Sequence, residues 1–488
     1  MHDHEKSDSA ILAMNPANAE AESAERRAET KRKTRDTAQA EYPSRKIVSP
    51  GFDRLRMRGK DHQDEPFTTL LHHINTETLS QAYYLLNRNA SVGVDGVAWK
   101  TYGENLQENI ADLLTRVHRG GPYHPQPSRR VLIPKPDGKQ RPLGIASLED
   151  KIVQRVVVEI LDAIYEPMFL CFSYGFRPGK SQHDALDSLW VGIHNKRVNW
   201  IVDADLRSFF DTVGHERLIA MLEQRIQDKR VIRLINKWLK AGVLENGLVR
   251  ASEIGTPQGA VISPMLSNIF LHYALDLWVH EWRQAAGRGD VIMVRYADDF
   301  VCGFEHEADA QAFLAELTSR MKEYGLELHD KKTRLIEFGR FAIERRMKRG
   351  MRKPETFTFL GFTHISAKDH NGKFQLLRKS RRDRLRAKRK QVKNKLRARI
   401  NESVSVQGKW LGSVLRGYFA YHAIPCNISS LYDIRNGVVH DWLRLLRRQS
   451  QRTNWTWARM MRLANEWLPM PRITHPWPRY RFAVKHSR

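Results

Sequence analysis

Two short apolar stretches separated by a pair of aspartates constrain the fold of this chain more than any other feature. Residues 291–296 and 300–304 have the length and composition of strands, and Asp298 and Asp299 lie in the turn between them. Such a hairpin fixes the backbone beneath both carboxylates at the edge of a sheet. Hard oxygen ligands in that position suit Mg²⁺. Because Asp-rich turns are also common for structural reasons alone, the pair needs further support.

A second apolar stretch supplies a further carboxylate. Residues 200–202 lead into Asp203 and Asp205. Three carboxylates would balance much of the charge of two Mg²⁺ ions about 3.5 to 4 Å apart, an arrangement that activates an attacking 3′-hydroxyl and stabilises leaving pyrophosphate. Strand alternation places Asp203 and Asp205 on the same face, so periodicity does not choose between them. Only Asp205 stands at the strand tip, so we predict Asp205 as the third ligand and Asp203 as structural.

The surrounding pattern is mixed. Residues 148–165 carry an apolar side chain at every fourth position, which predicts a helix, and residues 266–277 predict another. Residues 130–134 and 141–145 flank a Pro-Asp-Gly-Lys turn and predict a hairpin with basic residues on both arms. We therefore expect an α+β fold in which helices back an antiparallel sheet.

The chain is strongly basic. It holds 81 Lys and Arg against 55 Asp and Glu, a formal net charge of +26. Such a surface attracts polyanions, of which nucleic acid is the commonest, although basic residues can also serve solubility alone. Its three cysteines lie far apart, so the sequence supports neither a disulfide framework nor a cysteine-rich zinc module. The N-terminus is polar and no apolar run is long enough to span a bilayer, which predicts a cytoplasmic protein without membrane contact.

Two segments are rich in cations, one at the N-terminus and one in the C-terminal third of the chain. Residues 1–66 contain few large apolar side chains before Phe67, and we expect a basic, disordered extension there. Residues 378–400 place many Arg and Lys around a thin apolar stripe, which predicts a basic amphipathic helix. A solvated helix face is the alternative to an RNA contact. The predicted contacts with RNA phosphates are Arg384, Arg386, Lys388, Arg389 and Lys393.

Several motifs resemble those of reverse transcriptases, in the family's order. Tyr296-Ala297-Asp298-Asp299 resembles the Y-x-D-D box, and Asp205 with Phe210 resembles the D-x-x-x-x-[FY] box. Residues 255–259, followed by Ser263-Pro264 and Asn268, resemble the B box in its intron-encoded form. A basic region and residues 410–421 downstream resemble the X or thumb region of maturases. The chain is thus similar to group II intron-encoded reverse transcriptases and maturases of the bacterial type, from about Phe67 to its end.

This resemblance implies a right-hand polymerase and assigns its parts. It implies helical and hairpin fingers at 67–195, an antiparallel-sheet palm at 196–366, and an α-helical thumb or X domain with a short basic tail at 367–488. After residue 421 no paired cysteines and histidines occur, so we expect no endonuclease domain of the kind some relatives carry. One departure from the family pattern is Gly214 before His215, where an acidic or polar residue is usual.

The resemblance also implies roles for single residues. Lys135 and Arg141 match residues that grip the incoming triphosphate, and Gln258 offers an amide to nucleotide or template. Phe210 would face the sugar of the nucleotide and clash with a 2′-hydroxyl. Lys332 matches the D-box lysine that protonates pyrophosphate, and the adjacent Lys331 remains an alternative. Two more family boxes follow: the fingers box with Arg177, a predicted RNA or primer-template contact, and residues 357–362, which resemble the primer-gripping E box.

The implied function is an RNA-directed DNA polymerase that copies group II intron RNA from a DNA primer and assists splicing of that intron. Its cofactor would be two Mg²⁺ ions, with Mn²⁺ as a substitute, and its partners intron RNA, a DNA primer or target, and dNTPs. A domesticated or diversity-generating bacterial enzyme without a splicing role is an alternative, although Ser263-Pro264 and the long thumb argue against the diversity-generating kind. An RNA-binding splicing factor without polymerase activity is another, which the intact Asp205, Asp298 and Asp299 disfavour.

Overall fold

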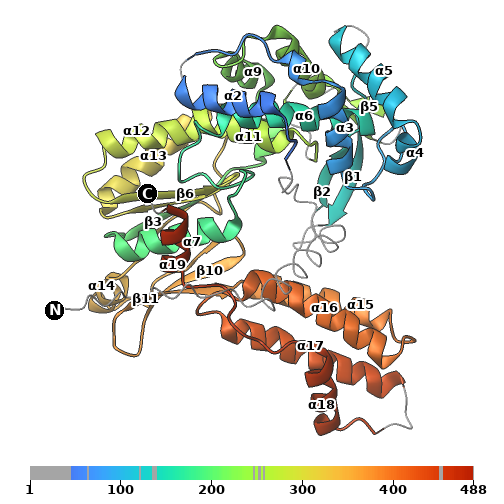
Figure 1. Ribbon diagram of the computed structural model, residues 1–488. Helices are drawn as coiled ribbons and strands as arrows, with labels where there is room; N and C mark the ends of the chain where they lie inside the picture. The colour runs from blue at the N-terminus through green and yellow to red at the C-terminus, as the bar shows by residue number, and fades with distance from the viewer. Residues whose placement is uncertain are drawn as a thin grey trace, which may run out of the picture. The chain divides into compact units, whose positions relative to one another are not determined.

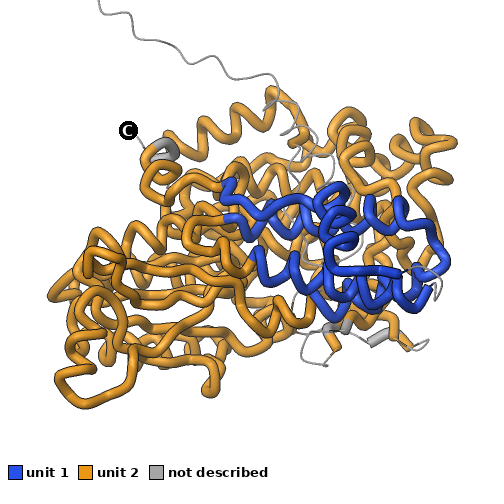
Figure 2. The backbone as a smooth tube through the Cα atoms, turned by 90° about the horizontal axis from the view of Figure 1, so that it is seen from below, with its two compact units in different colours: residues 1–37, 389–423, 431–474 blue, residues 38–388, 424–430, 475–488 orange. Residues whose placement is uncertain are grey.

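The computed structural model describes residues 46–62, 65–119, 123–134, 140–245, 248–250, 254–255, 259–449 and 454–486. They form two compact units (Figure 2). The larger contains the described residues up to 388 together with 424–430 and 475–486, and the smaller contains residues 389–423 and the described part of 431–474. The content of the chain is α+β, which confirms the predicted fold class.

The Asp-Asp turn belongs to a four-stranded antiparallel sheet with the order β6-β7-β3-β8. Helix α13 (Glu307–Glu323) packs against β3 and β7, while α7 (Gln182–Asn195) packs against β6 (Figure 1). Ile201 and Val202, which are neighbours on β3 and point to opposite faces of the sheet, are both fully buried, so both faces are covered at this strand. The predicted strands are confirmed as β6 (Val291–Tyr296), β7 (Asp299–Phe304) and β3 (Trp200–Asp205), and β8 (Arg334–Glu337) completes the sheet.

The predicted basic hairpin is also present. Strands β1 (Ser128–Pro134) and β2 (Gln140–Ile145) pair antiparallel. β1 also pairs in parallel with β4 (Val243–Glu245), which pairs with β5 (Leu248–Arg250), so the four strands form a second sheet. Next to it, α6 (Leu148–Tyr165) has the bounds expected from its four-residue repeat and is buried along most of its length. The helices around it are α3 (Thr76–Leu85), α4 (Trp99–Gly103), α5 (Leu106–His118), α9 (His215–Glu223) and α10 (Lys229–Lys240), with a 3₁₀ turn at Leu71–His73.

The predicted extension over residues 1–66 is wrong in its second part. Helix α2 (Pro50–Asp61) begins at the Ser49 cap, has proline in its first turn, and packs against α6. Its Phe52 and Leu55 are buried, and so is Ile47 before it. Because these buried apolar side chains are few and stand among many charges, the sequence showed no clear helical pattern here. Residues 1–45 lie outside the described part of the chain.

The predicted boundary at 366/367 falls inside a strand. β9 (Phe357–Phe359), β10 (Phe362–Lys368) and β11 (Phe374–Ser380) form a three-stranded sheet, with α14 (Ala342–Lys348) against β10. The basic helix expected from residue 378 therefore begins only at Arg382, because Arg378 lies in β11. Arg378 is buried there and its Nη1 is 2.9 Å from Asp187 Oδ1 on α7. The C-terminal helix α19 (Pro478–His486) also packs against α7.

The smaller unit is helical, as expected for this region. It consists of most of α15 (Arg382–Arg397), α16 (Val404–His422), most of α17 (Ile428–Gln449) and α18 (Trp457–Trp467). The indole nitrogen of Trp442 donates to Gln407 Oε1 at 2.8 Å inside this bundle, and both side chains are fully buried. In the described part of the chain, no helix combines the length and apolar character that crossing a membrane requires.

Candidate active site

The three predicted carboxylates lie toward the same end of the strands of the central sheet. Asp205 ends β3 and lies opposite Asp299, the first residue of β7, in the antiparallel register. Asp298 precedes Asp299 in the turn, where Ala297 takes a left-handed conformation with φ of 58°. Asp203 lies two residues before Asp205 on β3, and its Oδ2 accepts a hydrogen bond from Arg334 Nη2 at 3.1 Å. This contact agrees with the structural role expected for Asp203.

The electrostatics of this edge favour a cation. Burial, followed by the nearby charges of Asp298, Asp203 and Asp205, raises the pKa of Asp299 to about 8, although the backbone N–H of Leu360 opposes this shift. Within the described residues, no three Asp, Glu, His or Cys side chains converge closely enough to form a finished metal site. Closely spaced carboxylates that repel one another are nevertheless a donor set that fits a hard divalent ion.

Lys332 is the cation that the structure places at this edge. Its Nζ lies 2.5 Å from Asp205 Oδ2. The turn that carries it is fixed to the end of β3, because the backbone N–H of His329 donates to the Asp205 carbonyl at 2.8 Å and that of Lys332 returns to the His329 carbonyl at 2.9 Å. The sequence left Lys331 and Lys332 as alternatives, and of these two described lysines only Lys332 contacts one of the predicted metal-binding carboxylates.

Phe210 lies on the short helix α8 (Phe209–Thr212), directly after β3, and is half-buried. The base of the B box packs against that helix. A Cβ on Gly255, whose φ is +87°, would lie 3.0 Å from the Phe210 carbonyl oxygen, so only glycine permits this approach. The backbone N–H of Gly255 donates to the Val213 carbonyl at 2.8 Å. Gly255, the first residue of the predicted B box, thus lies against the backbone that carries Phe210.

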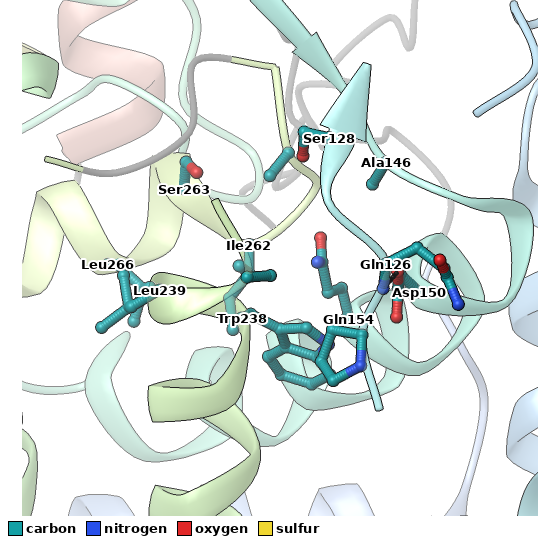
Figure 3. Close-up of a pocket in the computed structure, with 13 residues that line it drawn as sticks. Gln126, Ser128, Ala146, Asp150, Gln154, Trp238, Leu239, Ile262, Ser263 and Leu266 are labelled. Atoms are coloured by element: carbon teal, nitrogen blue, oxygen red, sulfur yellow. Dashed lines mark hydrogen bonds between the residues drawn. The ribbon is translucent and has the colours of Figure 1, made fainter. Parts of the chain in front are cut away.

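A glutamine on α6 contacts the segment that follows residues 255–259. Gln154, with Ser128, Asp150 and Trp238, lines a small pocket (Figure 3). The backbone N–H of Val261 donates to Gln154 Oε1 at 3.1 Å. Because this glutamine is buried and lies far from the motif in sequence, no sequence pattern indicates its role.

Some predicted substrate contacts lie outside the described residues. These are Lys135 and Gln258, and for Arg141 only the backbone is described, in register with Ile133 across the β1–β2 hairpin. Their roles remain predictions.

Arg177 is placed differently from the prediction. It is 7% exposed, and its guanidinium group donates to Glu166 at 2.8 Å and to the carbonyl oxygen of Ser173 at 2.7 Å. A side chain whose donors are used inside the protein is poorly placed to contact RNA, so this placement speaks for a structural role.

The predicted RNA contacts on α15 fall into two groups. Arg384 and Arg386 are exposed, and Lys388 is half-buried. Arg389 and Lys393 instead face α17, where Arg389 Nε lies 3.0 Å and Lys393 Nζ 3.7 Å from the buried Asp441 carboxylate. Because the helix turns, some of its cations face solvent while others face α17. The amino-acid composition alone does not tell which cation belongs to which group.

Comparison with known proteins identifies the central part of the chain. Residues 133–364 match the family model described as reverse transcriptase (RNA-dependent DNA polymerase). Protein YkfC of Escherichia coli is 40% identical over 241 residues, which cover 43% of this chain and 62% of that protein. The group II intron-encoded protein LtrA of Lactococcus lactis is 37% identical over 230 residues, 47% of this chain and 38% of LtrA. Nuclear intron maturase 4 of Arabidopsis thaliana is 24% identical over 249 residues, 49% of this chain and 29% of that protein.

The chain therefore covers less than two thirds of these relatives. The match spans every motif at the carboxylate edge, from the β1–β2 hairpin to β10. Reverse transcriptases generally use a divalent metal ion, which agrees with the donor set described above. Residues 133–364 therefore match the reverse transcriptase family, and this part of the chain is similar to group II intron-encoded proteins.

Proposed function

We propose that this protein is an RNA-directed DNA polymerase that copies group II intron RNA and also binds that RNA to assist its splicing and mobility. The observation that carries the polymerase half is the register of Asp205 opposite Asp299, with Asp298 in the adjoining turn. The two motifs lie far apart in the chain, and this register brings their three carboxylates toward the same end of the sheet.

Asp205, Asp298 and Asp299 would hold two Mg²⁺ ions, with Mn²⁺ as a substitute. When bound, such ions supply Lewis-acid activation of a primer 3′-hydroxyl and of leaving pyrophosphate. Around them, Phe210 excludes a 2′-hydroxyl, Lys332 donates a proton to pyrophosphate, and the Leu360 N–H orients the Asp299 carboxylate. Lys135, Arg141 and Gln258 are the proposed contacts with the dNTP.

The splicing half is supported by similarity to proteins named as intron-encoded proteins and maturases. It is also supported by the exposed cations Arg384 and Arg386 at the start of the helical region. In terms of a right-hand polymerase, we propose that the fingers begin at residue 46 rather than 67. The palm would then include the whole of β10 and β11, and the thumb would begin at Arg382. The proposed partners are intron RNA, a DNA primer or target, and dNTPs, and the proposed location is cytoplasmic.

Primer extension on an RNA template with Mg²⁺, run beside a splicing assay on the flanking intron RNA, tests both halves. Asp298→Ala should abolish extension and leave splicing intact, because the carboxylate serves nucleotide transfer only. Asp330→Ala is a matched control, since Asp330 is an exposed carboxylate in the Lys332 turn. Extension by Asp298→Ala at the wild-type rate would refute the metal assignment. Extension by the wild type without any splicing would instead favour an enzyme that has no maturase role.

A further inference from the structure

A fully buried arginine stands next to the metal-binding turn. Arg295, the fifth residue of β6, is 0% exposed. Its Nε and Nη2 lie 2.7 and 2.5 Å from the two carboxylate oxygens of Asp276. Its Nη2 also donates to Ser173 Oγ at 2.7 Å, and its Nη1 donates to Asn268 Oδ1 at 3.1 Å and to the Ala297 carbonyl at 3.0 Å. The partner side chains are buried too, so this is a closed polar network inside the core.

The network holds the backbone from which Asp298 projects. Ala297, whose carbonyl Arg295 binds, has a φ of 58°, which costs free energy for any residue with a Cβ. A second segment contacts the other side of the same residue: a Cβ on Gly175 would come within 2.2 Å of the Ala297 nitrogen, so the two backbones touch. Asn268 Nδ2 donates to the Gly175 carbonyl at 2.6 Å and fixes that segment to Arg295.

Asp276 reaches Arg295 from an unusual piece of helix. Between α11 (Ser263–Leu271) and α12 (Leu277–Ala285), residues His272–Asp276 form a π-helical turn, and Asp276 is its last residue. A π-helical turn inserts one residue into the regular α-helical repeat and is kept mostly where function needs it. Here the turn lies where the carboxylate meets the guanidinium group of Arg295.

Stability alone explains this network poorly. A buried ion pair loses so much hydration that apolar side chains of similar volume often stabilise a core equally well or better. Arg295 donates to four groups. Asp276 and Asn268 lie on one distant segment and Ser173 on another, and the fourth group is the carbonyl of Ala297 in the metal-binding turn itself. Hydrogen bonds from one guanidinium group to all of these groups fix the position of the Ala297 backbone relative to the core.

We infer that Arg295, Asp276 and Asn268 form a positioning network, which sets the Ala297 peptide and thereby the directions of the Asp298 and Asp299 carboxylates. Arg295 touches no substrate in this role, so it is a positioning residue. The inference deepens the proposed polymerase function and rests on it for the effect on nucleotide transfer. The effect on the turn itself does not depend on that function.

The double substitution Arg295→Met with Asp276→Leu separates positioning from stability. It replaces the ion pair by apolar groups, but Ser173 Oγ, Asn268 Oδ1 and the Ala297 carbonyl lose a donor, so the melting temperature should fall by several degrees while the protein stays folded. The amides of residues 296–299 should exchange hydrogen at least tenfold faster, because the Ala297 carbonyl loses its donor. Mn²⁺ binding to the free protein, followed by electron paramagnetic resonance, should weaken about tenfold or more. Single-turnover nucleotide addition should slow about 10²-fold, with primer–template affinity unchanged within twofold.

A matched control is the double substitution Arg155→Met with Glu159→Leu. This pair is buried on α6, its Nη2 to Oε1 distance is 2.6 Å, and its two residues are one helical turn apart. All four measurements should stay at wild-type values. Arg295→Lys provides a second test, because an ammonium group keeps the charge opposite Asp276 but cannot serve the same four acceptors. It should show the same faster exchange, and full rescue by lysine would overturn the inference.

A folded double variant with wild-type exchange at 296–299 and wild-type Mn²⁺ affinity would also overturn the inference. If the double variant does not fold, the same hydrogen exchange of residues 296–299 is measured in Asn268→Ala, and it should again be faster than in the wild type. This substitution removes the hydrogen bond to the Gly175 carbonyl and one acceptor of Arg295. A wild type that extends no primer refutes the proposed function instead, and the exchange comparison then still judges the positioning network.

Discussion

The ammonium nitrogen of Lys332 lies 2.5 Å from Oδ2 of Asp205, the carboxylate at the tip of β3. The pair joins two motifs far apart in the chain, one predicted to bind metal and the other to supply a proton. A lysine held at this edge of the sheet is within reach of a phosphate bound there. The contact therefore supports Lys332, rather than Lys331, as the general acid.

Replacing this lysine should slow chemistry more than binding. For Lys332→Ala we expect single-turnover nucleotide addition to fall about 10²-fold, because general acid catalysis typically contributes that much or more. The apparent dNTP dissociation constant should change little. The solvent deuterium isotope effect on the addition rate should also change, since a proton transfer is removed. Lys331→Ala is the control and should stay within about twofold of the wild type. A larger loss for Lys331→Ala than for Lys332→Ala would reverse the assignment.

Sugar selection should depend on the Phe210 ring. Phe210 is anchored on α8 by Phe209, whose ring centroid is 5.4 Å away, and Gly255 presses on its backbone carbonyl. For Phe210→Ala we expect the preference for dNTP over rNTP to fall by an order of magnitude or more, because the steric clash with a 2′-hydroxyl disappears. Competing incorporation of the two nucleotides measures this ratio. Phe210→Tyr keeps the ring and should keep the preference. Unchanged selectivity in Phe210→Ala would sink the assignment.

The sequence predicted the elements whose signals are local. The hairpin around Asp298, the strand that ends in Asp205 and the helix at 148–165 all follow from apolar periodicity over a few residues, and the structure confirms them. The α2 helix was missed because the buried apolar side chains of this segment, Ile47, Phe52 and Leu55, are too few to give a clear repeat among many charges.

The contacts that position the site were not predictable from such patterns. Arg295 lies in an apolar strand and looks like a solvent-facing charge, but its partner Asp276 reaches it through a π-helical turn that has no known local signature. Likewise Arg389 and Lys393 look like the other cations of their helix until Asp441 of α17 is placed beside them. Pairing over long sequence distances decides the role of these residues, and a single sequence does not record it.

A buried histidine should make the protein sensitive to mild acid. His364 on β10 stacks on Phe357 with an interplanar angle of 5°, and burial, followed by the charge of Arg378 on the neighbouring strand, lowers its pKa to about 3. The unfolded chain takes up this proton near pH 6.5 and the folded chain only near pH 3. The stability contributed by neutral His364 is thus complete above pH 6.5 and is lost as the pH falls toward 3.

His364→Phe should remove this contribution and keep the stacking. Between pH 7 and pH 5 the free energy of unfolding of the wild type should fall by roughly 2 kcal/mol more than that of the variant. Urea unfolding at the two pH values measures the difference. His370→Phe is a control, because it also exchanges a histidine for phenylalanine but at an exposed position in the turn after β10. Equal pH dependence of the wild type and His364→Phe would show that His364 accepts a proton without cost in the fold.

The exposed cations at the start of α15 should determine how intron RNA affinity depends on salt. Arg384 and Arg386 face solvent, whereas Arg389 is engaged with Asp441. If each exposed arginine neutralises one phosphate, the double variant Arg384→Gln with Arg386→Gln should reduce the slope of log K against log salt by roughly 1.5 to 2. Primer extension on a short unrelated template should persist. Lys100→Gln with Lys322→Gln, two exposed lysines on α4 and α13, removes the same net charge and should leave the slope unchanged. An equal loss of slope in both double variants would mean that RNA senses only the total charge of the protein, and that α15 is no specific contact.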